Sequence, residues 1–447
     1  MDVAGTSALL TDHYELTMVD AAIKAGTAGR RCVFELFSRR LPSGRRYGVV
    51  AGVARALDAI EGFRFTEDEL AFLANNRVVS DVTLEFLAGY RFSGDVVGYA
   101  EGDLYFPGSP LLSVTGTFAE AVLLETVLLS IYNYDSAVAS AASRMTMMAE
   151  DRPCIEMGAR RANENAAWAA ARAAYIAGFA STSDLEAGRR FGIPTAGTAA
   201  HAFTLLHDTE EQAFQAQVAA MGSNTTLLVD TYDIAEAVRT AVKVAGTGLG
   251  AVRIDSGDLR ATAREVRVLL DELGAFKTRI IVTSDLDEYQ IAALSGTPVD
   301  GYGVGTNLVT GSGAPTCSFV YKMVSRAEST DPQAPLLPVA KKSAAKSTVG
   351  GLKYAVRRLD ASGIAQAELV GVGKRPESDS NDRPLLVELV RHGEIVGREP
   401  ISAARERHSL ARDELPRDGY KMSRGDPVIP TFFIGADGQP LPNPYSG

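Results

Sequence analysis

The stretch "GAVRIDSGDLRATAREVRVLLDELG", residues 250–274, contains the pattern that decides the fold. A short apolar run turns polar at "DSGD", and apolar residues then recur every three or four positions until Gly274. This change of period predicts a strand followed by an amphipathic helix, with the glycine ending the helix. The stretch is therefore one βα unit.

The same layout, apolar first and then polar, occurs in three other segments: "TTLLVDTYD" (225–233), "TRIIVTSDLD" (278–287) and "VDGYGVGTN" (299–307). The four segments begin at residues 225, 250, 278 and 299, and consecutive βα units at such a spacing favour a parallel sheet. The strands are almost continuously apolar, which indicates that both faces of the sheet are covered. After "TRIIVT" we expect a further helix with Ser284 or Asp285 as its N-cap. These patterns predict an α/β protein built around a (β/α) barrel, in which polar residues after the strands line one catalytic mouth.

The flanks of the chain follow a different pattern. Short strands and turns fill the first part, and they return from about residue 355. The connection at 325–338 is polar and contains proline, and the one at 341–353 is basic. We therefore predict an N-terminal α+β domain over residues 1–135, completed by about 355–447, beside a catalytic barrel domain over 136–354.

The composition excludes several classes of protein. Of the 447 residues, 46% are hydrophobic and 22% are charged, which is typical of globular proteins. The net charge of −10 argues against a protein that coats nucleic acid or anionic membrane, and no apolar run is long enough to span a bilayer. The three cysteines are far apart and indicate neither a disulfide framework nor a zinc site. Because the start lacks the pattern of a signal peptide, we expect a cytoplasmic enzyme.

The segment "VRIDSGDL" places charged residues around one strand end. Alternation directs Arg253 and Asp255 to the same face of the strand, and Asp258 follows in the loop. One interpretation is an internal ion pair between Arg253 and Asp255 of purely structural value. The other is a guanidinium fork for a substrate carboxylate, with carboxylates that bind ribose hydroxyls or Mg²⁺. The residues alone leave both interpretations open.

Two further segments have features of phosphate sites. The loop "DGYGVGTNLVTGSG" (300–313) is rich in glycine directly after a strand, so its backbone N–H groups can converge on phosphate, although a plain tight loop has the same pattern. The adjacent Arg160 and Arg161 lie in "EMGARRANENAAWAAARAAYIAG" (156–178), before an alanine-rich helix. They suit phosphate if the fold brings them beside the glycine loop, and otherwise they form a solvated face.

One histidine lies in unusual surroundings. "PTAGTAAHAF" (194–203) contains His201, one of only five histidines, among Gly, Ala and Thr. Small neighbours leave an imidazole room for a ligand, and they also suit a turn packed against a helix.

Taken together, these segments resemble nicotinate phosphoribosyltransferases. The matches follow the order and approximate spacing of that family from about residue 10 to 355: "LTDHYELTM" (10–18), "EMGARR" (156–161), "GFASTSD" (178–184), "GTAAH" (197–201), "RIDSGDL" (253–259), "GVGTN" (303–307) and "KKSAAKSTVGGLK" (341–353). The resemblance implies an incomplete (β/α) barrel of the type II phosphoribosyltransferase kind with a smaller α+β domain. It also implies that the enzyme joins nicotinate to phosphoribosyl pyrophosphate, with Mg²⁺ and coupled ATP hydrolysis, in the first step from nicotinate toward NAD.

The resemblance also implies roles for individual residues. His201 corresponds to the histidine that ATP phosphorylates. Thr198 and Arg253 correspond to nicotinate contacts, with the arginine at the carboxylate. Tyr14 corresponds to the aromatic residue that stacks on the pyridine ring from the neighbouring subunit of a homodimer. The positions carried over to the phosphoribosyl and pyrophosphate side are Arg160, Asp255, Asp258, Gly305 and Thr306, of which the two aspartates would stabilise the cationic ribosyl group.

Two positions depart from the family pattern, and other classes of protein compete with this one. Met157 stands where related nicotinamide enzymes have a ring-stacking aromatic residue, and "STVGGLK" departs from the usual Thr-x-Pro-Gly. Quinolinate would need a denser basic pocket than Arg253 alone, and nicotinamide lacks the anion that this arginine would meet. A barrel lyase would need a Schiff-base lysine at a strand end, and a nucleotide sensor would lack His201 or Asp255.

Overall fold

The computed structural model describes residues 6–341 and 348–445, which divide into two compact units. The first unit contains residues 1–137 and 316–447, and the second contains 138–315. The predicted barrel domain runs to residue 354, whereas the second unit ends at Pro315. Part of the basic segment predicted at 341–353 lies outside the described residues.

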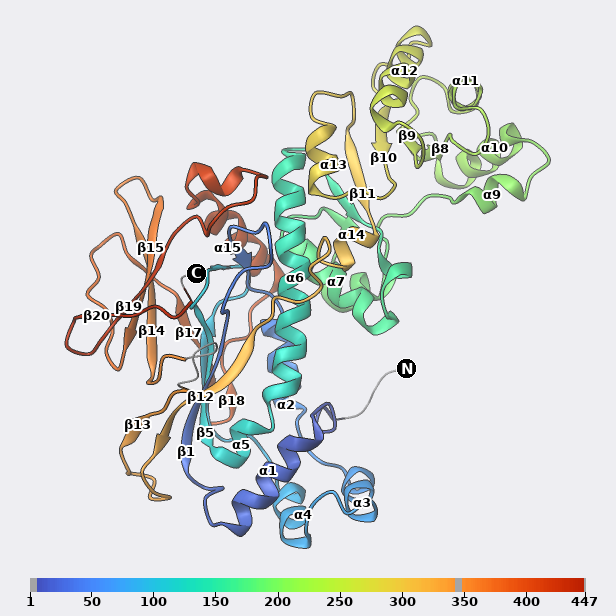
Figure 1. The fold of residues 1–447 in the computed structure, drawn as a ribbon. Helices are drawn as coiled ribbons and strands as arrows, with labels where there is room; N and C mark the ends of the chain where they lie inside the picture. The colour runs from blue at the N-terminus through green and yellow to red at the C-terminus, as the bar shows by residue number, and fades with distance from the viewer. Residues whose placement is uncertain (1–5, 342–347, 446–447) are drawn as a thin grey trace. The chain divides into compact units, whose positions relative to one another are not determined.

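The second unit is built on a six-stranded sheet in the order β7-β6-β11-β10-β9-β8. All of its strand pairs are parallel, and β7 and β8 form its two edges, so that the sheet is an open half-barrel (Figure 1). The strands are β6 (Cys154–Glu156), β7 (Ser181–Thr182), β8 (Thr226–Leu228), β9 (Ala251–Ile254), β10 (Arg279–Val282) and β11 (Gly301–Val304). The predicted parallel sheet is confirmed, because the four predicted segments contain β8 to β11.

Helices connect these strands, as expected for βα units. They are α7 (Glu164–Ile176), α8 (Leu185–Phe191), α9 (His201–Leu205), α10 (Glu210–Met221), α11 (Ile234–Ala245), α12 (Leu259–Glu272), α13 (Glu288–Ala293) and α14 (Thr306–Val309). Helix α12 ends as predicted just before Gly274, which has a positive φ of 75°. The predicted N-cap of α13 is wrong: Ser284 and Asp285 lie in the preceding loop, and Asp287 caps the helix by accepting from the backbone N–H groups of Tyr289 and Gln290.

The first unit contains a seven-stranded sheet in the order β13-β12-β1-β5-β3-β17-β18. Strand β12 (Val320–Ala327) pairs antiparallel with β1 (Arg31–Phe37), which pairs on its other side with β5 (Pro110–Thr117). This pairing explains why the second unit ends before residue 354. The predicted connection at 325–338 therefore includes the end of β12 and all of β13 (Leu336–Pro338).

A second sheet of the first unit has the order β16-β14-β15-β19-β20, and its central pair is β14 (Lys353–Leu359) with β15 (Ala365–Val372). The remaining strands are β2 (Gly48–Val49), β3 (Asp95–Tyr99), β4 (Leu104–Tyr105), β16 (Arg383–Pro384), β17 (Leu386–Arg391), β18 (Glu394–Ile395), β19 (Thr431–Ile434) and β20 (Pro440–Leu441). The α-helices are α1 (His13–Lys24), α2 (Val53–Glu61), α3 (Glu67–Asn75), α4 (Asp81–Ala88), α5 (Phe118–Val122), the first part of α6 (Glu125–Ala149) and α15 (Ile401–Asp413).

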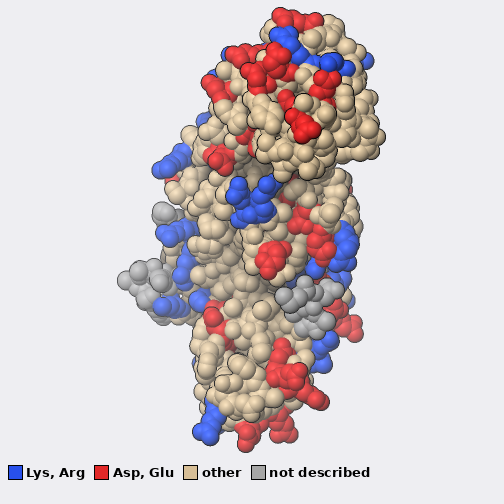
Figure 2. Space-filling model, turned by 90° about the vertical axis from the view of Figure 1, so that its right-hand side faces the viewer, with Lys and Arg blue, Asp and Glu red and all other residues tan. Residues whose placement is uncertain are grey.

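The apolar core of the first unit is rich in aromatic rings. Phe34 of β1 stacks on Tyr321 of β12 with ring centroids 5.0 Å apart, which fixes the pairing of two strands that are distant in sequence. None of the helices in residues 6–341 and 348–445 is long and apolar enough to cross a membrane. Figure 2 shows acidic and basic side chains interspersed over one face.

Candidate functional site

The carboxyl ends of β8, β9 and β10 bring four polar residues into one hydrogen-bonded group. Asp230, directly after Val229 at the end of β8, accepts through Oδ2 from the backbone N–H of Asp255 at 2.8 Å and from Ser256 Oγ at 2.7 Å. Asp255 follows β9, and its Oδ1 accepts from Thr283 Oγ1, which follows β10. These contacts hold both carboxylates at the mouth of the half-barrel.

His201, the first residue of α9, lies against this group. Its Nδ1 is 3.1 Å from Thr231 Oγ1, and its Nε2 is 3.8 Å from Asp230 Oδ1 and 4.0 Å from Asp255 Oδ2. The histidine side chain is 41% exposed, so that a ligand can reach it. The structure therefore brings the predicted His201 and Asp255 together.

Asp230 is a candidate functional residue that the sequence interpretation missed. Only 1% of its side chain is exposed, and its Oδ1 makes no hydrogen bond to another described residue. A buried, unsatisfied carboxylate oxygen is costly unless it has a functional role. The sequence contains one signal that points to Asp230 as a site residue: it is the first polar residue after the apolar run of "TTLLVDTYD".

Arg253 of β9 contacts the segment that precedes α9. Its Nη2 donates to the carbonyl oxygen of Ala199 at 3.1 Å, and Nη1 lies 3.5 Å from Thr198 Oγ1. Its Nε is buried and has no hydrogen-bond partner among the described residues. Burial lowers the pKa of the Arg253 guanidinium, although Asp255 and Asp230 oppose that shift. No ion pair joins Arg253 to Asp255 in the described structure, so the purely structural interpretation loses its basis.

Arg253 and Thr198 line a cavity of about 520 Å³ inside the half-barrel. Arg160 and Met157 line the same cavity. Strand β11 leaves space for the methionine, because a Cβ atom at Gly303 would lie 2.7 Å from Met157 Sδ and 2.5 Å from Thr283 Cγ2. Three of the predicted residues, Arg160, Thr198 and Arg253, thus surround one ligand-sized space.

The arginine pair and the glycine loop are neighbours, as the phosphate interpretation requires. Strands β6 and β11 pair in parallel, and the backbone N–H of Met157 donates to the carbonyl oxygen of Val304 at 2.8 Å. A Cβ atom at Gly305 would lie 3.3 Å from the carbonyl oxygen of Met157, and Thr306 begins α14 next to it. The exposed Arg160 lies in the single 3-10 turn that follows β6.

The remaining two predicted residues differ in their surroundings. Asp258 caps α12, with Oδ1 accepting from the backbone N–H groups of Arg260 and Ala261 at 3.1 Å, and its side chain lines a second cavity. Tyr14 belongs to α1 of the first unit and is 46% exposed. Burial, with Glu125 as the next contribution, raises the pKa of Tyr14 to about 12.

The site is rich in carboxylates but contains no preformed metal cage. No group of three or more His, Cys, Asp or Glu side chains suited to a metal occurs among the residues that the structure describes. A Mg²⁺ ion usually needs only one or two carboxylates, because substrate phosphates and water complete its coordination. Asp255 and Asp258 fit that donor requirement.

Comparisons with known proteins agree with this geometry. The family model for the N-terminal domain of nicotinate phosphoribosyltransferase (NAPRTase) matches residues 9–133. Nicotinate phosphoribosyltransferase pncB1 of Mycobacterium tuberculosis is 54% identical over 437 residues, which cover 96% of this chain and 95% of that protein. Its pncB2 counterpart is 38% identical, with 92% and 88% of the two chains covered.

The solved structures give the same result for the fold. Human nicotinic acid phosphoribosyltransferase superposes with a TM-score of 0.81 at 25% identity, covering 96% of this chain and 98% of that one. Nicotinate-nucleotide pyrophosphorylase from Pyrococcus furiosus shares the fold, with a TM-score of 0.76 at 23% identity over 93% and 98% of the two chains. The half-barrel and its partner unit are those of a type II phosphoribosyltransferase.

The degree of identity narrows this class further. With more than half of its residues identical to a curated relative over nearly the whole length, the chain belongs to the nicotinate phosphoribosyltransferase family. It is an enzyme of NAD biosynthesis.

Proposed function

We propose that the chain joins nicotinate to phosphoribosyl pyrophosphate at this site and couples the reaction to ATP. The products are nicotinate mononucleotide and pyrophosphate, with ADP and phosphate from ATP. The observation that carries this proposal is a pair of unsatisfied groups at one barrel mouth: the buried Nε of Arg253 and the buried Oδ1 of Asp230. The guanidinium suits an anionic substrate, and the carboxylate suits the imidazole of His201.

Nicotinate binds in the cavity lined by Arg253 and Thr198. The guanidinium offers a planar pair of donors that matches a carboxylate, and the threonine hydroxyl adds a third donor. Nicotinamide has no charge for this arginine to meet. Quinolinate has a second carboxylate, for which the lining offers one further cation, the Arg160 guanidinium, and that group binds phosphate instead.

The phosphoribosyl group binds beside the nicotinate cavity. Arg160 supplies a cation, and the backbone N–H groups around Gly305 and Thr306 supply donors for phosphate oxygens. Asp255 and Asp258 would hold a Mg²⁺ ion together with the diphosphate, and that ion neutralises charge on the leaving group when bound. The two aspartates also stabilise the positive charge that develops on the ribosyl carbon.

The chemical step itself needs no general base. The pyridine nitrogen of nicotinate attacks the ribosyl C1 with its lone pair as the C1–O bond to pyrophosphate breaks, and no proton is transferred. Positioning and electrostatic stabilisation therefore supply the acceleration. His201 is therefore not needed as a general base in this step and can have another role.

That role is to accept phosphate from ATP. In the proposed step, His201 Nε2 moves toward Asp230 Oδ1 from the 3.8 Å that separates them and donates its proton to that oxygen in a hydrogen bond, which leaves the lone pair on Nδ1 as the nucleophile. Nδ1 attacks the γ-phosphorus, the bond to the β-phosphate oxygen breaks, and ADP leaves. Water later hydrolyses the N–P bond. While it lasts, the phosphohistidine adds negative charge that orders the Mg²⁺–pyrophosphate site.

Product analysis tests the proposed reaction directly. Purified protein is incubated with phosphoribosyl pyrophosphate, ATP and Mg²⁺, and with nicotinate, nicotinamide or quinolinate in separate reactions. Mass spectrometry should detect nicotinate mononucleotide from nicotinate, with far slower turnover of nicotinamide. Faster product formation from nicotinamide or quinolinate would contradict the assignment of Arg253 to the nicotinate carboxylate.

We further propose a homodimer in which Tyr14 of one subunit completes the site of the other. The exposed Tyr14 ring suits stacking on a pyridine ring, and it belongs to a different unit from Arg253. Tyr14→Ala and Arg253→Ala proteins, each inactive alone, should regain part of the activity when their subunits exchange, because one site of a mixed dimer is intact. A mixture that remains as inactive as its parents under exchange conditions would rule out shared sites.

A further inference from the structure

The glycine-rich loop after β11 contains one residue that its backbone conformation does not favour. Gly311, Ser312 and Gly313 follow one another in the left-handed region, with φ angles of 61°, 52° and 82°. Glycine adopts such angles without strain, whereas a serine there is uncommon and strained. The serine side chain must therefore supply something at this position that a third glycine would not.

The Ser312 side chain is bound to a buried carboxylate. Its Oγ donates to Oε2 of Glu288, the first residue of α13, at 2.6 Å. The other oxygen of that carboxylate, Oε1, accepts from Nε of Arg144, on α6, at 3.1 Å, and both charged side chains are almost fully buried. Because the Arg144 guanidinium holds the carboxylate in place, Ser312 is bound to a fixed point of the second unit.

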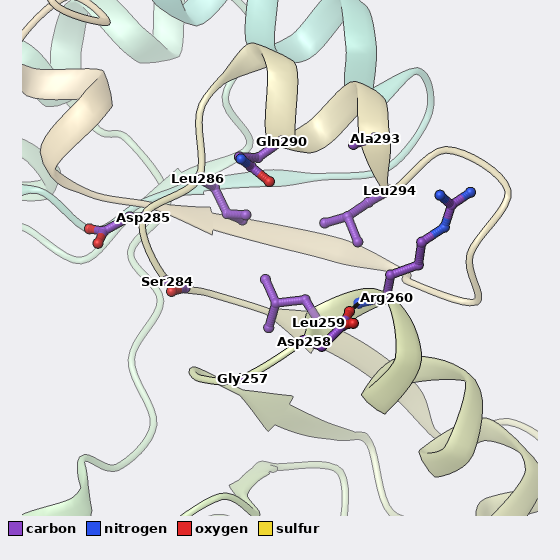
Figure 3. Close-up of a pocket in the computed structure, with 10 residues that line it drawn as sticks. All are labelled: Gly257, Asp258, Leu259, Arg260, Ser284, Asp285, Leu286, Gln290, Ala293 and Leu294. Carbon is purple, nitrogen blue, oxygen red and sulfur yellow. Dashed lines mark hydrogen bonds between the residues drawn. The ribbon is translucent and has the colours of Figure 1, made fainter.

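A second set of hydrogen bonds joins the same loop to the loop after β10. The backbone N–H of Ser312 donates to the carbonyl oxygen of Asn307 at 2.6 Å. The side-chain amide of Asn307 donates in turn to the carbonyl oxygens of Asp285 and Leu286, each at 3.2 Å. Figure 3 shows Asp285 and Leu286 in the connection between β10 and α13, shortly before the helix that carries Glu288.

Together these contacts fix the loop after β11 near both of its ends. Asn307 holds the start of the loop, next to Gly305 and Thr306, and Ser312 holds its end. The paired register of β10 and β11 ends before any of these residues, so the sheet itself does not hold them. Backbone N–H groups that are ordered before a ligand arrives lose less conformational entropy when it binds.

We infer that Ser312 and Glu288 are positioning residues, which hold the backbone N–H groups that bind the phosphates of phosphoribosyl pyrophosphate. The inference rests on the proposed function, which assigns these phosphates to the N–H groups around Gly305 and Thr306. Neither positioning residue has to touch the substrate. The strain of the left-handed serine is offset by a binding loop that is ordered in advance.

Ser312→Gly separates the positioning role from a purely structural one. Glycine suits a φ of 52° better than serine does, so this substitution removes the hydrogen bond to Glu288 while it relieves backbone strain. Ser318→Gly is the matched control, because Ser318 has a φ of 56° but its exposed side chain makes no hydrogen bond to another described residue.

Glu288→Gln is the conservative variant. Its amide can still pair with the Ser312 hydroxyl, which either donates or accepts, but the buried Arg144 loses the charge of its partner. Three quantities are measured for each protein: the Kd for phosphoribosyl pyrophosphate with Mg²⁺ by calorimetry, the steady-state constants, and the midpoint of thermal unfolding.

Ser312→Gly should raise the Kd and the KM for phosphoribosyl pyrophosphate about tenfold, while kcat, the KM for nicotinate and the unfolding midpoint stay near the wild-type values. Ser318→Gly should match the wild type in every measurement. Glu288→Gln should lower the unfolding midpoint but largely keep the binding of phosphoribosyl pyrophosphate.

Two results would overturn the positioning role alone. One is wild-type binding of phosphoribosyl pyrophosphate by the Ser312→Gly protein, and the other is a loss of binding that follows the unfolding midpoint across the three variants. A wild-type protein that does not bind phosphoribosyl pyrophosphate would instead overturn the assignment of this loop to phosphate, and the inference with it.

Discussion

Two sets of buried charges differ, those paired beside the sheets of the first unit and the one at the strand ends of the second. In the first unit, Arg357 pairs with Glu368 at 2.9 Å and Lys353 pairs with Glu35 at 2.8 Å, all four side chains being almost fully buried. At the strand ends of the second unit, the equally buried Asp230 carboxylate forms no ion pair with a Lys or Arg side chain among the residues that the structure describes. Removing one partner of a buried ion pair destabilises the fold, because the other charge stays buried without compensation. A buried charged group that has no such partner is instead available to a substrate.

The largest expected effect concerns His201, which lies beside the unpaired Asp230 carboxylate. His201→Ala should abolish ATP hydrolysis and acid-labile labelling by γ-labelled ATP, because the variant has no nucleophile for the phosphoryl group. Nicotinate mononucleotide should still form slowly at high phosphoribosyl pyrophosphate, with a raised KM for that substrate.

His207→Ala is the matched control for this variant, since His207 is also half-buried but its imidazole contacts Phe203 of α9 rather than the carboxylates at the strand ends. It should keep normal labelling. Complete loss of product in folded His201→Ala protein, even at saturating substrate, would instead place His201 in the chemical step.

Substitutions in the buried ion pairs of the first unit should lower the free energy of unfolding rather than change the catalysed reaction. Glu368→Ala leaves Arg357 buried without its main partner and also removes the acceptor for the Tyr99 hydroxyl, so the free energy of unfolding should fall by about 3–5 kcal/mol. Denaturant unfolding measures the change. Glu186→Ala, which breaks an exposed pair on α8, should have little effect. Equal losses for the two variants would contradict the distinction between buried and exposed pairs.

A conservative change at Arg253 should have an intermediate effect. Arg253→Lys keeps the charge but loses the planar pair of donors, so nicotinate binding should weaken by about 1.5–3 kcal/mol, the range for hydrogen bonds to charged groups. Steady-state kinetics should place the loss on nicotinate more than on phosphoribosyl pyrophosphate. Arg264→Lys, at an exposed position on α12, serves as the control. An unchanged KM and kcat for nicotinate would remove Arg253 from the site.

A pH-dependent effect sharpens the comparison, because Glu15 of the first unit is a buried carboxyl with no Lys or Arg partner in residues 6–341 and 348–445. Burial raises its pKa from 4.5 to about 8, although hydrogen bonds from Thr126 oppose the shift. The folded protein therefore keeps a proton that the unfolded chain releases, so this contribution to stability is full below about pH 4.5 and is lost as the pH rises to about 8.

The slope from Glu15 is at most about 1.4 kcal/mol per pH unit. Unfolding measured between pH 5 and 8 should show that Glu15→Gln flattens the dependence, while Glu85→Gln, at an exposed position on α4, does not. The same pH dependence in both variants would mean that Glu15 is ionised in the folded protein.

Local patterns in the sequence predict much of the second unit. The apolar runs of β8 to β11 and the helix that ends before Gly274 are encoded within short stretches, so periodicity suffices to find them. The antiparallel pairing of β12 with β1 is not encoded locally, because it joins segments from the two ends of the chain. The boundary after residue 315 was therefore beyond the reach of periodicity.

For the candidate site, too, some residues could be predicted from the sequence and others only from the folded structure. The strand pattern placed Arg253 and Asp255 around one strand end, and the family resemblance singled out His201. The structure brings His201 and Asp255 together and places Arg253 against the segment before α9. Asp230 was missed because its importance depends on the position of α9, which only the folded chain defines. The N-cap of α13 was misplaced because Ser284 has a positive φ of 126°, which no local polar pattern predicts.

The central claim is that the unsatisfied Asp230 carboxylate after β8 supports the phosphorylation of His201. The most direct test is tandem mass spectrometry of the wild-type protein after brief incubation with ATP and Mg²⁺, under conditions that preserve phosphohistidine. A single phosphoryl group on His201, strongly reduced in Asp230→Asn protein, is the predicted result. A phosphoryl group on another residue, or normal labelling of His201 in Asp230→Asn protein, would contradict the account.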